Sequence, residues 1–153
     1  MLTIELICVS KTRAPGIEIA LADYLPRLKH VCRFNLVAVR EEKVLDEVHR
    51  DLEVARLREK RNPRALHIAL DERGAEMTSA EFAKWIERYR DSARDLQFFV
   101  GGPLGLGPAF REECHQVMSL TKMTLPHDLV RLLFVEQLYR GFSILAGSAY
   151  HKV

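Results

Sequence analysis

The chain has 153 residues, of which 48% are hydrophobic and 29% charged, and its formal net charge at pH 7 is +2. This length suits one domain with a sizeable core, and the composition excludes a disordered or low-complexity chain. No apolar run approaches the roughly 18–20 residues that a membrane span requires. So small a net charge is compatible with binding to RNA but does not demand it.

The three cysteines, Cys8, Cys32 and Cys114, lie far apart and form no CxxC or Cys/His ligand spacing. We therefore expect reduced thiols in a cytoplasmic protein, with neither a disulfide framework nor a metal site. The first apolar run, residues 1–6, contains Glu5 and has no basic segment before it. It predicts a strand and not a signal peptide.

Short apolar runs alternate with longer amphipathic stretches in the first half of the chain. Residues 3–9 and 33–39 have strand patterns, and the segment 17–28 between them has helical spacing. Residues 41–61 predict a charged helix with one buried stripe, which ends before the Asn-Pro pair at 62–63. The predicted stripe consists of Val44, Leu45, Val48, Leu52 and Ala55.

A third strand is predicted at 66–70 and a fourth at 96–100, with a helix between them. Thr78, with Glu81 three residues later, forms a capping box that predicts where this helix begins. The two acids at 71–72 follow the third strand, where catalytic carboxylates are also found. We interpret them as solvated loop residues.

The rest of the chain predicts a short helix at 108–117, a strand at 118–121 and a long helix at about 126–146. Strands separated by helices of this length predict an α/β fold, a mostly parallel sheet with helices on both faces. The last helix is apolar around its whole circumference between Leu129 and Leu145. Either it is central to the domain or one face packs on a second subunit. We favour the second subunit, because symmetric dimers are the commonest oligomers.

The segment 101–108, directly after the fourth strand, contains four glycines and two prolines. Such a backbone can approach a ligand closely, and in an open α/β sheet this loop lies where ligands bind. It contains neither the Gly-Lys-Ser/Thr of a phosphate loop nor the G-x-G-x-x-G of a dinucleotide site. From local sequence, a ligand-binding loop is only slightly favoured over a structural turn.

Three other segments are ambiguous by themselves. Residues 120–127 read as a strand–loop–helix junction, with His127 an ordinary helix-start residue. Residues 150–152, Tyr-His-Lys, suit a stacked base and its phosphate, although a frayed terminus is the simpler interpretation. The arginines at 56–64 are interspersed with acids, which favours a solvated face over an RNA contact.

Together these motifs resemble the RlmH family, the bacterial 23S rRNA pseudouridine N3-methyltransferases of the SPOUT superfamily. The resemblance covers essentially the whole chain and implies one domain, residues 1–153, with a C-terminal trefoil knot. It implies a homodimer that acts on pseudouridine 1915 of 23S rRNA within the 50S subunit or 70S ribosome, without membrane or metal. The residues that carry the resemblance are 99–105, 120–127, Arg131, Glu136, 139–140 and 150–152.

The resemblance also implies S-adenosylmethionine as the cofactor. Its implied contacts are Leu70, Gly101, Leu120, Thr121, Lys122, Met123, Thr124 and Leu125. The implied catalytic residues are Glu136, Arg140, Tyr150 and His151, with His127 as a further candidate, and the tail of one subunit completes the site of the other.

The target N3 is a protonated imide nitrogen, so it must lose its proton or have its carbonyls polarised before attack. Which group takes this proton stays open. Lys152 ends the tail motif, and lysine cannot make the bidentate phosphate contact of an arginine. A SPOUT enzyme acting on tRNA and a non-catalytic, dimeric ribosome-binding module are the alternatives.

Overall fold

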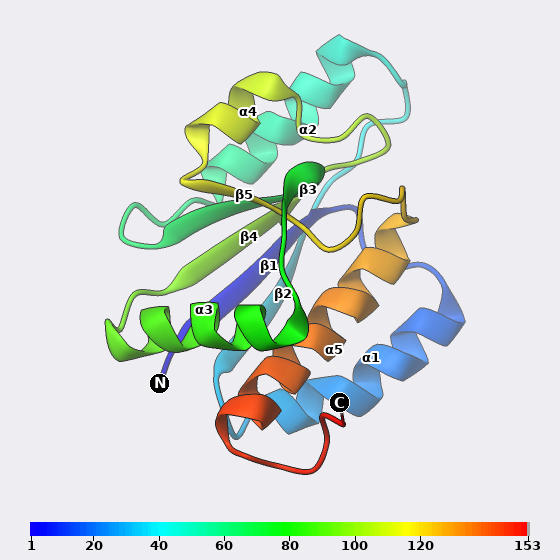
Figure 1. The fold of residues 1–153 in the computed structure, drawn as a ribbon. Helices are drawn as coiled ribbons and strands as arrows, with labels where there is room; N and C mark the ends of the chain where they lie inside the picture. The colour runs from blue at the N-terminus through cyan, green and yellow to red at the C-terminus, as the bar shows by residue number, and fades with distance from the viewer. Residues whose placement is uncertain (153) are drawn as a thin grey trace.

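The computed structural model describes residues 1–152 and contains a five-stranded parallel sheet with the strand order β2-β1-β4-β3-β5. Five helices cover the sheet (Figure 1). In chain order the elements are β1 (Thr3–Val9), α1 (Pro15–Leu28), β2 (Arg33–Val39), α2 (Glu47–Glu59), β3 (Leu66–Glu76), α3 (Ser79–Asp91), β4 (Leu96–Val100), α4 (Pro108–Glu113), β5 (Gln116–Ser119) and α5 (His127–Leu145). The predicted α/β class, with helices on both faces of a parallel sheet, is confirmed.

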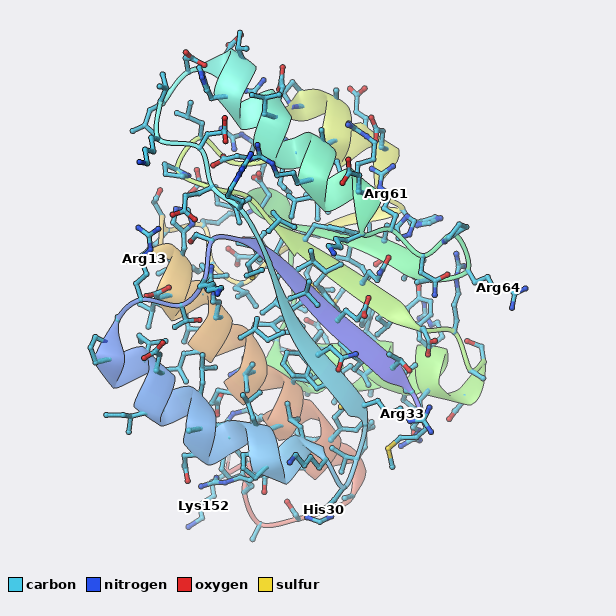
Figure 2. The ribbon with its side chains drawn as sticks, turned by 180° about the vertical axis from the view of Figure 1, so that it is seen from behind. Arg13, His30, Arg33, Arg61, Arg64 and Lys152 are labelled. Carbon is cyan, nitrogen blue, oxygen red and sulfur yellow. The ribbon has the colours of Figure 1, made fainter. Side chains whose placement is uncertain are left out.

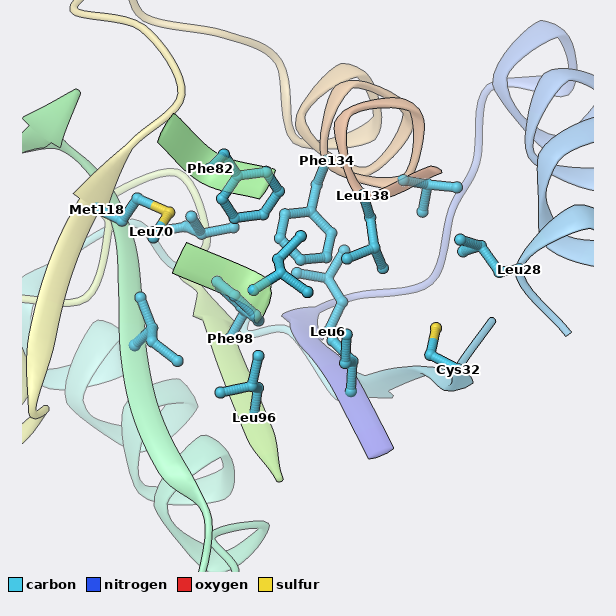
Figure 3. Close-up of a cluster of buried hydrophobic side chains, with 14 of the residues drawn as sticks. Leu6, Leu28, Cys32, Leu70, Phe82, Leu96, Phe98, Met118, Phe134 and Leu138 are labelled. Atoms are coloured by element: carbon cyan, nitrogen blue, oxygen red, sulfur yellow. The ribbon is translucent and has the colours of Figure 1, made fainter. Parts of the chain in front are cut away.

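The two faces of the sheet bury separate cores, because successive side chains of a strand point to opposite faces. Helices α1, α3 and α5 cover one face, and α2 and α4 cover the other (Figure 1). On the first face Phe98 of β4 packs against Phe134 of α5 with ring centroids 4.6 Å apart (Figure 3). On the second face Phe99, the next residue of β4, packs against Phe110 of α4 at 5.3 Å. β4 is therefore buried on both sides, as its continuous apolar run predicts.

The bounds of β1, β2 and β4 agree with the sequence prediction, and the predicted capping box is present. The hydroxyl of Thr78 accepts a hydrogen bond from the Glu81 amide at 3.1 Å. The Glu81 carboxylate accepts one from the Thr78 amide at 2.7 Å. Local hydrogen bonding alone therefore fixes where α3 begins.

Helix α2 begins at Glu47 and not at residue 41, because the Asp46 side chain caps it by accepting from the His49 amide at 2.8 Å. The predicted buried stripe was wrong for its first four members. Val54, Leu57 and the acid Glu53 form the buried face instead. Val44, Leu45, Val48 and Leu52 are 52%, 65%, 68% and 44% exposed, respectively.

Strand β3 is longer than predicted and is irregular at its carboxyl end. Leu70 and Ala75 both lie opposite Met118 of β5, so residues 71–74 bulge out of the ladder. Gly74 closes the bulge against the backbone of β5, where an added Cβ would lie 2.6 Å from the Met118 nitrogen. Helix α4 ends earlier and β5 begins earlier than predicted, because residues 116–118 pair with β3.

Helix α5 packs between α1 and α3 on the first face of the sheet. Phe134, Val135 and Leu138 are fully buried there, whereas Leu132 and Leu133 on its flanks are only half-buried. Packing on three sides accounts for much of the helix's all-round apolar character. Across residues 1–152, no helix is both long and apolar enough to cross a bilayer.

Candidate active site

A cleft of about 270 Å³ opens at the carboxyl ends of β3 and β4. Three predicted cofactor segments border it: Leu70 at the end of the regular part of β3, Gly101 after β4, and the loop at 120–125. Parallel strands place their carboxyl ends at one edge of the sheet, which brings these distant segments together. The cleft has apolar and backbone walls, the surroundings that an adenine ring requires.

The glycine-rich loop forms a tight turn on one side of the cleft. The Gly105 amide donates to the Gly102 carbonyl at 2.8 Å, and Gly105 has a φ of 72°, a conformation that favours glycine. A Cβ added to Gly101 would lie 2.3 Å from the carbonyl carbon of Gly105. Only glycine therefore fits at position 101 while the turn keeps this shape.

The loop at 120–125 forms the opposite side. All of its residues except Lys122 line the cleft. Lys122 instead donates from Nζ to the carbonyl oxygen of Gly74 at 2.6 Å and supports the bulge of β3. Thr124 Oγ1 donates to the Glu72 carboxylate at 2.8 Å, a second tie between this loop and β3.

Asp71 lies in the wall of the cleft and is not a solvated loop residue, so that interpretation was wrong for it. Its side chain is 6% exposed and pairs with Arg111 at 3.4 Å and Arg73 at 3.2 Å. The bulge turns the residue after Leu70 inward, which neither strand nor loop patterns reveal. A pair of acids directly after a buried strand was the only signal in the sequence.

The four predicted catalytic residues form a second cluster, on α5 and the tail. Glu136 Oε1 accepts from Arg140 Nη2 at 2.6 Å and from the Tyr150 hydroxyl at 3.0 Å. His151 Nδ1 lies 3.2 Å from Arg140 Nη1 and accepts a hydrogen bond from it, because a guanidinium only donates. The Arg140 guanidinium also lies over the Tyr150 ring, 4.8 Å from its centroid.

Two members of this cluster, Arg140 and Tyr150, keep their protons at neutral pH and so act as hydrogen-bond donors. Burial, together with hydrogen bonds to Tyr24 and Glu136, raises the pKa of Tyr150 well above its ordinary value. The hydrogen bond to Glu136 likewise raises the pKa of Arg140. Tyr150 therefore stays a neutral donor and Arg140 a cation at neutral pH.

The cluster and the cleft lie at different places along α5 in one chain. Glu136 comes nine residues after His127, which lines the cleft. At 1.5 Å per residue, that is about 14 Å along the helix axis. None of the four predicted catalytic residues borders the cleft. The frayed interpretation of the tail was wrong for Tyr150 and His151, which pack on α5.

The burial of two charged residues near the cleft was not predicted from the sequence. Glu53 is 5% exposed and accepts from the Glu42 amide at 2.9 Å, behind Gly102. Arg131 is 1% exposed and donates to the carbonyl oxygens of Val9 and Ser10 at 3.0 and 2.7 Å. No local pattern marks a single charged residue on a helix as buried. Within residues 1–152, no group of three or more His, Cys, Asp or Glu side chains is arranged to hold a metal ion.

An α/β fold with a backbone-walled cleft at one sheet edge suits a nucleoside-containing ligand, and comparison with known proteins specifies the class. A family model described as predicted SPOUT methyltransferase matches residues 2–151. The chain belongs to the SPOUT methyltransferase family.

Individual relatives agree over nearly the full length. The chain is 38% identical over 152 residues to the ribosomal RNA large subunit methyltransferase H of Gemmatimonas aurantiaca, covering 97% of this chain and 99% of the relative. It is 39% identical over 151 residues to the protein of the same name from an Anaeromyxobacter species, with the same coverage. Among solved structures, it is similar to the SpoU methyltransferase AviRb of Streptomyces viridochromogenes in complex with AdoMet. That similarity has 15% identity and a TM-score of 0.44, covering 89% of this chain and 56% of the other.

Proposed function

We propose that this protein transfers a methyl group from S-adenosylmethionine to N3 of a pseudouridine in 23S rRNA of the large ribosomal subunit. The observation that carries the proposal is the cleft that Gly101 and the loop at 120–125 border together. Membership of the SPOUT methyltransferase family and the names of the relatives support the reaction class and the RNA substrate.

The cleft offers what the cofactor requires. Leu70, Leu120 and Leu125 supply apolar walls, and the backbone of the glycine turn supplies amides and carbonyls at close range. Bound S-adenosylmethionine supplies a methyl group already activated by a sulfonium. The protein's remaining task is to present a deprotonated ring nitrogen in line with that methyl group.

Arg140, Tyr150 and His151 are the residues that we assign to the target base. Arg140 stabilises negative charge on the imide, and Tyr150 and His151 position the base by donating and stacking. Glu136 already accepts from Arg140 and Tyr150 on one oxygen and from Gln137 on the other at 2.7 Å. It therefore orients the other members of the cluster.

We propose that a homodimer brings the cofactor cleft of one chain together with the catalytic cluster of the other. The catalytic cluster of one chain lies too far along α5 to reach that chain's own cleft, so a partner's cluster would complete it. The half-buried Leu132 and Leu133 of α5 supply apolar surface for such an interface. Figure 2 shows Arg13 near one end of the α1–α5 pair and Lys152 near the other.

We propose that the protein acts in the cytoplasm on rRNA within the assembled ribosomal particle. A net charge of +2 provides little general attraction to RNA, so recognition would depend on the shape of the 50S subunit or 70S ribosome. Free 23S rRNA lacks that shape.

Methyl uptake tests the proposal. The protein is incubated with labelled S-adenosylmethionine and, separately, 70S ribosomes, 50S subunits, free 23S rRNA and tRNA, and mass spectrometry locates the label. The expected result is a methyl group on N3 of one pseudouridine in ribosomal particles. Uptake only into tRNA would identify a tRNA enzyme. No uptake, together with no calorimetric binding of millimolar S-adenosylmethionine, would identify a non-catalytic module.

A further inference from the structure

A second cavity, of about 830 Å³, adjoins the cofactor cleft. It lies at the carboxyl ends of β1 and β2, between the first turns of α1 and α5. The two cavities share Gly102, Pro103 and His127, so they meet along this common wall. A group placed beside these three residues in the second cavity would lie next to a ligand of the cleft.

We propose that the second cavity receives the target nucleoside and a flanking phosphate, and that His127 in the shared wall accepts the proton from the target ring nitrogen. This inference rests on the proposed function and specifies the acceptor side of that site. It places the proton acceptor on the chain that binds the cofactor, while Arg140, Tyr150 and His151 would come from the partner.

The lining of the second cavity suits a nucleotide. Val9, Ala14 and Ile17 provide an apolar surface for a base or ribose. Lys11 and Lys43 lie on the exposed rim and, within residues 1–152, form no ion pair, so both ammonium groups are available to a phosphate. Arg13 differs, because it is paired with Glu41.

The common wall is held by buried polar contacts. The Glu53 carboxylate packs directly behind Gly102, because a Cβ added to Gly102 would lie 2.7 Å from Oε1 of Glu53. The same carboxylate accepts from the Glu42 amide, and Glu42 in turn pairs with Arg56 at 2.9 Å. On the other side Asp128 accepts from the amides of residues 13 and 14 at 3.0 and 2.8 Å. The position of the common wall is therefore fixed by the fold.

His127 has the properties of a proton acceptor. Its ring is half-buried and makes no hydrogen bond within residues 1–152, so a nitrogen is free for substrate. Burial lowers the pKa of His127, and the Arg131 cation lowers it further, against the opposing effects of Asp128 and Glu53. The imidazole is therefore neutral at pH 7.

The proton and electron balance of the step closes without a further reactant. The ring N–H proton passes to the imidazole of His127, and the nitrogen keeps its electron pair. That pair forms the bond to the methyl carbon, while the methyl–sulfur bond breaks and its electrons return to sulfur. S-Adenosylhomocysteine and a methylated base remain, and the imidazolium releases its proton to water.

The test compares His127→Gln with His30→Gln in the intact protein. His30 is exposed and lines neither cavity (Figure 2). Calorimetry measures binding of S-adenosylmethionine, and single-turnover methyl transfer to the ribosomal substrate is followed from pH 5 to 9. We expect H127Q still to bind the cofactor but to transfer methyl at least about a hundredfold more slowly. The wild-type rate should fall as acid protonates His127, and the H127Q profile should lack this acid limb.

Two outcomes would overturn the assignment of His127. One is a wild-type rate in H127Q, and the other is a slow H127Q rate that keeps the same acid limb. Failure of the proposed function differs from both, because wild-type protein would then transfer no methyl to ribosomal particles.

A double variant, Lys11→Ala with Lys43→Ala, tests whether the second cavity receives the nucleoside and its phosphate. We expect a several-fold higher KM for ribosomal particles, with cofactor affinity and kcat unchanged. An unchanged KM with a weakened dimer would instead mean that the cavity holds the partner's tail, which contradicts the proposal.

Discussion

The Lys122 ammonium group donates a hydrogen bond of 2.6 Å to the carbonyl oxygen of Gly74, 48 residues earlier in the chain. This contact joins the loop at 120–125 to the bulge of β3. It also holds the Lys122 side chain away from the cleft. Lys122 would therefore support the cofactor site from behind, through its contact with the bulge.

Replacing Lys122 by methionine tests this supporting role. The variant keeps much of the side-chain volume but loses a charged hydrogen bond, an interaction typically worth about 1.5–3 kcal/mol. We expect S-adenosylmethionine to bind roughly tenfold more weakly in calorimetry. Lys84→Met, on the exposed side of α3, is the matched control and should bind normally. Equal affinities for the two variants would show that Lys122 does not support the cofactor site.

Gly101→Ala should close the cleft without unfolding the chain. The added Cβ meets the backbone of Gly105 and not a flexible side chain, so the turn must move, at a typical cost of about 1–3 kcal/mol. We expect loss of calorimetric binding and a lower Tm by circular dichroism. Gly16→Ala is the control, because nothing lies within 4 Å of its added Cβ. A G101A protein that binds the cofactor normally would contradict the site.

Asp128 should make stability depend on pH. Its burial raises the pKa, but the amides of Ala14 and Arg13 and the cation of Arg131 lower the pKa more, so it lies below its ordinary value. A carboxyl group with a lowered folded pKa stabilises the fold above its unfolded pKa of 3.8, and loses this effect as pH falls through the folded value.

We therefore expect Asp128→Ala to lower stability at pH 7 by about 1–3 kcal/mol, because two amides lose their acceptor. The loss should shrink below pH 4. Urea unfolding at several pH values measures it. Asp23→Ala, an exposed partner of Arg27, is the control and should change stability little at any pH. A D128A loss that is the same at pH 3 and pH 7 would argue against this linkage.

Mixing two inactive variants tests whether a site spans two subunits. Gly101→Ala disables the cleft, and Arg140→Ala disables the catalytic cluster. If each site combines the cleft of one chain with the cluster of the other, co-refolded variants should regain about a quarter of wild-type methyl transfer, since half the dimers hold one intact site. Light scattering should give twice the chain mass of 17.6 kDa. Absence of recovery in confirmed mixed dimers would place the whole site within one chain.

Much of the fold follows from local patterns in the sequence. Strand β4 is a continuous apolar run between helical segments, and Thr78 with Glu81 sets the start of α3, so periodicity and capping suffice for both. They fail at α2, where Asp46 rather than an apolar residue sets the boundary and leaves Val44 and Val48 exposed.

The candidate site, too, was predicted only in part from the sequence. Resemblance selects Gly101 and the loop at 120–125, and the fold brings them to one cleft. The inward turn of Asp71 and the outward turn of Lys122 depend on the bulge in β3, a tertiary feature that single-sequence patterns do not encode. The C-terminal trefoil knot and the single-domain assignment of the whole chain stay predictions.

A crystal structure of the protein with bound S-adenosylmethionine would show where the cofactor lies. We predict ligand density between Gly101 and the loop at 120–125, with the methyl group directed toward Gly102 and His127, where the second cavity begins. Density for the cofactor elsewhere, such as beside Tyr150 and Glu136, with the cleft left empty, would contradict it.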